Sequence, residues 1–198
     1  MSTPMGIDAL KDRVREIAGR YPDREERARR LFVEERAASL GADPERGFAI
    51  RTELATYFGI PYSAVSFCGS AQLGFSVHKD RLFTPAISDL DAACISPELF
   101  QRAWADVVRT TRAFTDATPF GHRTGREIEL FKQQILRRGM IRIDAMPISP
   151  LKREWQAFQN RISKNHTQKF SSISCAIYMN EFAFAWKQDS ALTSILEK

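Results

Sequence analysis

The chain has 198 residues, of which 43% are hydrophobic and 27% are charged, a balance typical of an ordinary globular protein. No apolar stretch approaches the roughly 20 residues that a membrane-spanning helix needs, and the first residues lack the basic and apolar segments of a signal peptide. We therefore expect a cytoplasmic protein with no membrane partner. The net charge of +5 is compatible with nucleotides or nucleic acid as partners but is too small to establish them.

The three cysteines, Cys68, Cys94 and Cys175, are far apart and lie within apolar runs. They are expected to be buried free thiols of a reducing compartment rather than disulfide partners or a zinc site. The three histidines are equally scattered, which argues against transition-metal chemistry.

The first part of the chain is expected to be helical. Residues 7–40 carry apolar side chains at helical spacing, and the pattern is interrupted at Pro22, which removes a backbone donor. Asp43, followed directly by proline, is typical of a helix start, and Gly59 ends that helix. We interpret residues 1–59 as an N-terminal helical extension.

The remaining segments alternate between strand and helix patterns. In chain order they are strands at 64–68 and 89–95, helices at 96–111 and 127–136, a strand at 140–144, a helix at 151–170, and a tail at 173–186. The tail is interpreted as a strand or hairpin, with a helix as the alternative. This order predicts an α/β (α+β) domain over residues 60–198, with a mixed β-sheet flanked by helices.

Chemistry-bearing residues gather around two of the predicted strands. The first strand ends at Gly69-Ser70, and a turn from strand to helix offers backbone N–H groups to phosphates. The second carries Asp89 and Asp91, which lie on one face because strand side chains alternate. Two adjacent carboxylates repel each other unless a cation lies between them, and Mg²⁺ carrying nucleotide phosphates meets that need.

This combination resembles the nucleotidyltransferase superfamily typified by DNA polymerase β and the small bacterial nucleotidyltransferases. The likeness covers about residues 60–145, and it is carried by Gly69, Ser70, Gly74, Ser88, Asp89 and Asp91. It implies a nucleotidyltransferase-like sheet in which the glycine and serine residues bind the phosphates of an NTP, ATP being favoured. It also implies that the two aspartates are catalytic and ligate Mg²⁺ or Mn²⁺.

Members of this family normally carry a third carboxylate on the next strand. Asp144 is our candidate for this catalytic and metal-binding role, because Ile141 and Ile143 would face the core and leave Arg142 and Asp144 on the other side. Arg142 would then either neutralise phosphate charge or pair with Asp144.

The resemblance implies transfer of a nucleoside monophosphate to a hydroxyl of a protein, RNA or nucleotide acceptor. Related small proteins often belong to phage-defence or toxin–antitoxin modules. Two alternatives stay open: an inactive nucleotidyltransferase fold that binds a protein partner, and a nucleic-acid-binding module that uses the basic residues Arg161, Lys164 and Lys169.

The site residues themselves have simpler interpretations. Ser70 can be a helix N-cap, and the two aspartates can be exposed turn or edge residues. The polar segment with His78, Lys79 and Arg81 either contacts the triphosphate or is only solvated. The aromatic residues Phe182, Phe184 and Trp186 fit a core better than a base-stacking platform.

Overall fold

The computed structural model describes residues 6–197. The helices are α1 (Ile7–Arg20), α2 (Arg24–Arg29), α3 (Pro44–Phe58), α4 (Gly69–Leu73), α5 (Pro97–Thr110), α6 (Gly125–Arg138), α7 (Pro150–Asn165) and α8 (Glu181–Leu196). The strands are β1 (Val65–Cys68), β2 (Phe75–Ser76), β3 (Arg81–Leu82), β4 (Leu90–Ile95), β5 (Met140–Arg142) and β6 (Ile173–Tyr178). A four-stranded mixed sheet and a small two-stranded sheet accompany these helices, so the predicted mixed α/β class is confirmed.

The main sheet has the strand order β1-β4-β6-β5. Strand β4 pairs antiparallel with β1 and parallel with β6, and β5 pairs antiparallel with β6. A parallel pair requires a long crossover, and here that connection contains α5, α6, β5 and α7. Strand β4, which carries Asp91, therefore lies between strands from distant parts of the chain.

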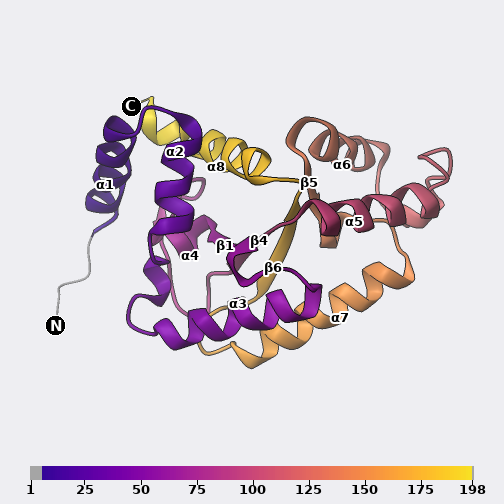
Figure 1. Cartoon of the computed structure of the whole chain (residues 1–198), viewed down its shortest axis with the longest axis horizontal. Coiled ribbons are helices and arrows are strands. Elements are labelled where there is room, and N and C mark those ends of the chain that lie inside the picture. Colours follow the sequence, from indigo (N-terminus) through magenta and orange to yellow (C-terminus); the bar gives the residue numbers. More distant parts are fainter. Residues whose placement is uncertain (1–5, 198) are drawn as a thin grey trace.

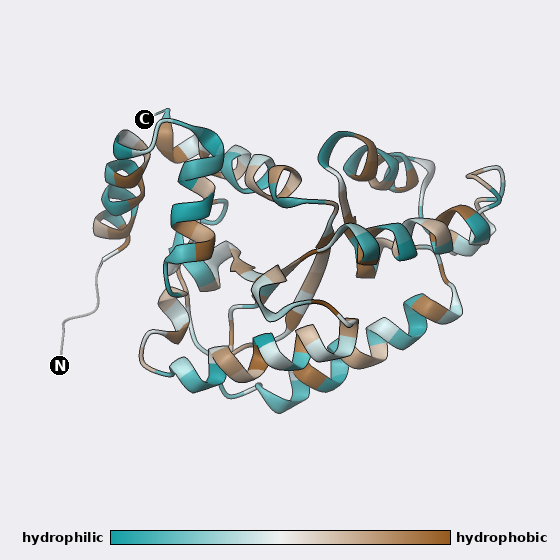
Figure 2. Ribbon diagram, in the orientation of Figure 1, coloured by the Kyte–Doolittle hydropathy of each residue, from teal (hydrophilic) through white to brown (hydrophobic). Residues whose placement is uncertain are grey.

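Helices cover both faces of this sheet (Figure 1). One face packs into an α3–α5–α7 core, which includes Leu54, Phe100 and Trp155. The other packs into an α1–α2–α8 core, which includes Val14 and Phe184. The strands between them are predominantly hydrophobic (Figure 2), as expected for a sheet buried on both sides.

The helices of the predicted N-terminal extension belong to these two cores. Helix α3 packs on one face of the sheet, and α1 and α2 pack on the other together with α8. The ring of Phe32, in the π-helical turn after α2, meets the ring of Phe184 edge-on at 6.2 Å between centroids. Residues 6–59 thus complete the hydrophobic interior around the sheet.

Several predicted boundaries are confirmed at their caps. Asp23 accepts hydrogen bonds from Glu25 N and Glu26 N at the start of α2, directly after the break at Pro22. Asp43 accepts from Arg46 N at the start of α3. These caps satisfy backbone N–H groups that have no partner within the helix.

The tail differs from the preferred prediction. The first half of the tail is a strand, β6, as predicted, but after it the chain forms helix α8, so the hairpin interpretation is wrong and the helical alternative holds for residues 181–186. Asn180 accepts a hydrogen bond from Ala183 N and starts this helix. The alternation of Phe182, Phe184 and Trp186 was misleading because Phe182 and Trp186, four residues apart, lie on the exposed side, whereas Phe184 is buried.

Three other boundaries need correction. The strand predicted at 140–144 ends at Arg142, and Asp144 lies in a 3₁₀ turn, Ile143–Ala145, just before Pro147. Helix α7 ends at Asn165, five residues earlier than expected. Strand β4 starts at Leu90, so Asp89 directly precedes it.

No helix within residues 6–197 is both long enough and apolar enough to cross a membrane.

Candidate functional site

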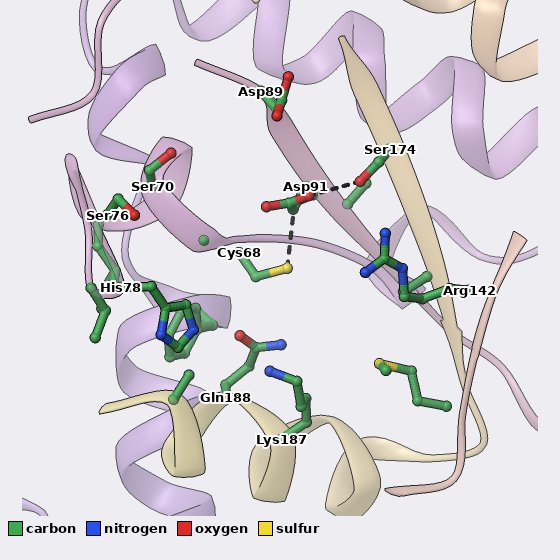
Figure 3. A pocket seen from close by; sticks show the side chains of 18 of the residues that line it. Cys68, Ser70, Ser76, His78, Asp89, Asp91, Arg142, Ser174, Lys187 and Gln188 are labelled. Carbon is green, nitrogen blue, oxygen red and sulfur yellow. Dashed lines mark hydrogen bonds between the residues drawn. The ribbon is translucent and has the colours of Figure 1, made fainter. Parts of the chain in front are cut away.

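A cavity of about 470 Å³ lies at the junction of β1, β4 and β6 and is closed on one side by α8 (Figure 3). Of the seven residues predicted for the site, six line this cavity: Gly69, Ser70, Ser88, Asp89, Asp91 and Asp144. The motif residues that the sequence separates by about twenty positions therefore share one concave surface.

Asp91 occupies the centre of the cavity floor. In the sheet register it lies between Cys68 of β1 and Ser174 of β6. Its Oδ1 accepts a hydrogen bond of 2.7 Å from Ser174 Oγ, which fixes the orientation of the carboxylate. Asp91 is half-buried, so the side chain is held in place while one side stays open to the cavity.

The turn at Gly69 meets this carboxylate directly. Gly69 has φ +65°, a left-handed backbone conformation that residues other than glycine rarely adopt. A Cβ built on Gly69 would lie 2.6 Å from Asp91 Oδ2, so that the carboxylate would have to move from its present position. Glycine is thus needed for both the backbone conformation and the close approach of Asp91.

Asp89 is exposed at the edge of the cavity and is held by the loop before β6. Its Oδ1 accepts hydrogen bonds from the hydroxyls of Ser171 and Ser172. Ser88, beside it, is buried and organises the same region: its Oγ accepts from Thr84 N at 3.0 Å, and its carbonyl oxygen accepts from Ser171 N. Ser88 therefore supports the loop that carries Asp89.

Ser70 and Gly74 have different outcomes. Helix α4 begins at Gly69 with Cys68 in the N-cap position and no side-chain cap, so Ser70 is not the N-cap that the simpler interpretation required. Ser70 lines the cavity. Gly74 ends α4 with φ +84°, and a Cβ there would lie 3.2 Å from both Ala38 Cβ and Leu10 Cδ1, which indicates a role in packing.

Asp144 is paired with Arg142, as one of the two predicted options required. The guanidinium donates from Nε at 3.1 Å and from Nη2 at 2.7 Å to the two carboxylate oxygens. This hydrogen-bonded pairing raises the pKa of Arg142 above its usual value. Within residues 6–197 no group of three or more His, Cys, Asp or Glu side chains is arranged to hold a metal, so Asp144 does not join Asp89 and Asp91 in such a group.

Two carboxylates nevertheless suit a particular kind of cation. Hydrogen bonds from the described residues reach Oδ1 of both Asp89 and Asp91, whereas none reaches Oδ2 of either. Mg²⁺ is usually bound by one or two carboxylates together with substrate phosphates and water. The donor set therefore fits a phosphate-bound Mg²⁺ or Mn²⁺ better than a metal enclosed by protein ligands alone.

The residues that the sequence interpretation missed come from α8. Lys187 and Gln188 extend into the cavity from the side opposite Asp89 (Figure 3). Burial lowers the pKa of the half-buried Lys187, and the nearby Arg138 acts in the same direction. Gln188 Nε2 donates to the hydroxyl of Tyr178 at 3.2 Å. The predicted tail ended at Trp186 and was interpreted as a strand or hairpin, whereas helix α8 continues through both residues and its spacing places Gln188 on the buried side.

The polar segment before β4 also reaches the cavity. His78, Lys79 and Arg81 all line it, and all three are exposed. The segment that the sequence left as either solvated or ligand-contacting therefore forms part of the cavity wall.

The cysteines are buried free thiols, as predicted. Burial and the neighbouring Asp91 both raise the pKa of the Cys68 thiol, so it stays uncharged at neutral pH and is a poor nucleophile. The sulfurs of Cys94 and Cys175 lie 3.0 Å apart inside the α3–α5–α7 core.

Comparison of the chain with protein-family models, with curated proteins and with solved structures finds no match. The functional interpretation therefore depends on the geometry of the cavity and on the motif pattern.

Proposed function

We propose that the chain is a metal-dependent nucleotidyltransferase with a DNA polymerase β-like fold. It transfers a nucleoside monophosphate from an NTP, ATP being favoured, to a hydroxyl of a protein, RNA or nucleotide acceptor. The observation that carries this proposal is the contact between Gly69 and Asp91. It joins the phosphate-binding turn and the acidic pair at one cavity, as nucleotidyl transfer requires.

The residues have distinct roles in this proposal. Asp89 and Asp91 would hold the divalent cation, and serine hydroxyls orient both carboxylates through Oδ1. When bound, the cation supplies Lewis-acid stabilisation of the phosphate oxygens. Backbone N–H groups in the first turn of α4, which lack partners within the helix, and the Ser70 hydroxyl, which lines the cavity, would donate hydrogen bonds to phosphate. Most of the rate enhancement then comes from positioning and charge.

The direct test is incubation of the purified chain with Mg²⁺ or Mn²⁺ and each α-labelled NTP, with the chain itself, RNA and nucleotides as acceptors. We expect labelled product and pyrophosphate, both reduced about 10²-fold or more by Asp91→Asn. Asp12→Asn is a matched control, because Asp12 is exposed on α1 and does not line the cavity. Absence of product with every NTP and acceptor, or full activity of Asp91→Asn, would contradict the proposal.

A second candidate is an inactive nucleotidyltransferase fold that binds a protein partner. It is favoured by Ser174, a hydroxyl rather than a carboxylate, next to Asp91 in the sheet register. This candidate predicts nucleotide binding without pyrophosphate release. It also predicts partner binding that survives both Asp89→Asn and Asp91→Asn, and pull-down with these variants separates the two functions.

A further inference from the structure

The cavity is electrostatically divided. Asp89 and Asp91 lie just before and on β4, and cationic residues line other parts of the cavity wall: Lys187 on α8, Arg138 at the end of α6 and Arg142 on β5 (Figure 3 shows Lys187 and Arg142). One of these cations is already neutralised, because Arg142 pairs with Asp144. Neither of the other two, Lys187 and Arg138, has a carboxylate bound to it within the described residues.

Lys187 and Arg138 form no hydrogen bond or ion pair through their side chains with any residue between 6 and 197. Their surroundings differ, since Lys187 is half-buried on α8 and Arg138 is exposed at the end of α6. Asp91 acts on Lys187 only at a distance and is hydrogen-bonded to Ser174 instead. Lys187 is therefore not simply the salt-bridge partner of the acidic pair.

We propose that Lys187, assisted by Arg138, binds the polyphosphate chain of the nucleotide from the side of the cavity opposite the acidic pair. The inference rests on the proposed function, which it deepens by assigning the phosphate-binding residues of α8. The ligand class follows from chemistry: two unpaired cations facing a pair of carboxylates fit an anion that also carries a divalent cation.

The desolvation of Lys187 supports this assignment. Burial and Arg138 lower its pKa, which means that the charged ammonium is disfavoured in the free protein. A multiply charged anion in the cavity would remove that penalty. The cavity volume of about 470 Å³ also lies within the range of small-molecule sites, which is about 300–1,000 Å³.

The test uses inorganic tripolyphosphate as the probe, titrated calorimetrically into the full chain in EDTA at constant ionic strength. We expect Lys187→Met to weaken binding about tenfold or more and Lys187→Arg to retain most of it. Lys164→Met removes the same charge from an exposed position outside the cavity and should leave affinity unchanged. Thermal unfolding verifies that each variant folds.

Wild-type affinity in folded Lys187→Met would overturn the inference, as would an equal loss in Lys164→Met. No measurable binding to wild type would overturn it as well. The proposed function can fail independently. If tripolyphosphate binding depends on Lys187 but no NTP is turned over, the enzymatic function is contradicted and the anion site is supported. Conversely, if Lys187→Met leaves NTP turnover unchanged, the enzymatic function is supported and the anion site at Lys187 is contradicted.

Discussion

Gly69 is the residue at which conformation and chemistry meet. Its positive φ makes the turn from β1 into α4, and its lack of a side chain lets Asp91 Oδ2 approach the backbone. A sequence can suggest the turn, because Gly-Ser after an apolar run is typical of one. It cannot reveal the contact, which depends on how β1 registers with β4.

A pair of alanine substitutions separates the two requirements. Gly59→Ala, at φ +67° with open space around its Cβ, should cost about 1 kcal/mol of unfolding free energy from backbone conformation alone. Gly69→Ala adds the clash with Asp91 and should cost about 2–4 kcal/mol and reduce nucleotide binding. Urea denaturation and calorimetry measure both, and equal costs would show that the Asp91 contact is unimportant.

Lys187 leads to a prediction on pH. Only its protonated form attracts phosphate, and its pKa is lowered from 10.5 by burial, Arg138 and Arg142, against the opposing effects of Cys68 and Asp91. Tripolyphosphate affinity should therefore fall, as pH rises, earlier than for an ordinary lysine. Titrations from pH 7 to 10 should show this loss in wild type and a weaker one in Lys187→Arg, and identical profiles would argue against Lys187.

Among the secondary-structure elements, α8 determines most about the cavity and was the hardest to predict. One of its faces presents Lys187 and Gln188 to the cavity, and its next residue, Asp189, is buried at 5% exposure against α2. A helix that is buried on more than one side has no clean amphipathic period, because apolar and polar positions both face inward. The short alternation after Glu181 then resembles a strand.

Breaking the buried ion pair between α2 and α8 should strongly lower the free energy of unfolding. Asp189 pairs with Arg24 and Arg27, and Asp189→Asn leaves those guanidinium groups without a carboxylate, at a cost of about 3 kcal/mol. Arg29 and Glu181 join the same two helices at half-exposed positions, so Glu181→Gln should cost less than about 1 kcal/mol. Urea denaturation of the two variants decides, and equal costs would contradict the argument.

Strand β5, at the edge of the sheet, also shows that a local pattern does not predict which strands are neighbours. The alternation of Ile141, Arg142 and Ile143 correctly placed both isoleucines in the core, where they are fully buried. It could not show that β6 lies between β5 and β4. For that reason Asp144 is separated from Asp91 by a strand, and the immediate neighbour of Asp91 is Ser174.

For the whole molecule, the structure unites the predicted extension with the sheet domain. Helices from residues 6–59 contribute to both hydrophobic cores, so neither face of the sheet is closed without them. We therefore expect residues 6–197 to unfold cooperatively, because losing either layer exposes apolar surface on the other.

Phe32→Ala tests this unity. The buried ring packs against Phe184, and its removal should cost about 3–5 kcal/mol. We expect one transition, with the same midpoint shift by circular dichroism and by fluorescence of Trp155 in a Trp104→Phe, Trp186→Phe background. Trp155 lies in the opposite core, so separate transitions for the two probes would indicate an independent N-terminal unit.

The sequence by itself determined the mixed class, the capped helix starts and the strands around the motif, because caps and alternation act over a few residues. It also identified five residues that line the cavity: Gly69, Ser70, Ser88, Asp89 and Asp91. Only the tertiary structure decided that Ser174, 83 residues from Asp91, binds its carboxylate, and that Lys187 faces the same cavity. These contacts depend on the long crossover that sets β6 beside β4. No local pattern encodes such a pairing, since its free energy comes from burial on both faces of the completed sheet.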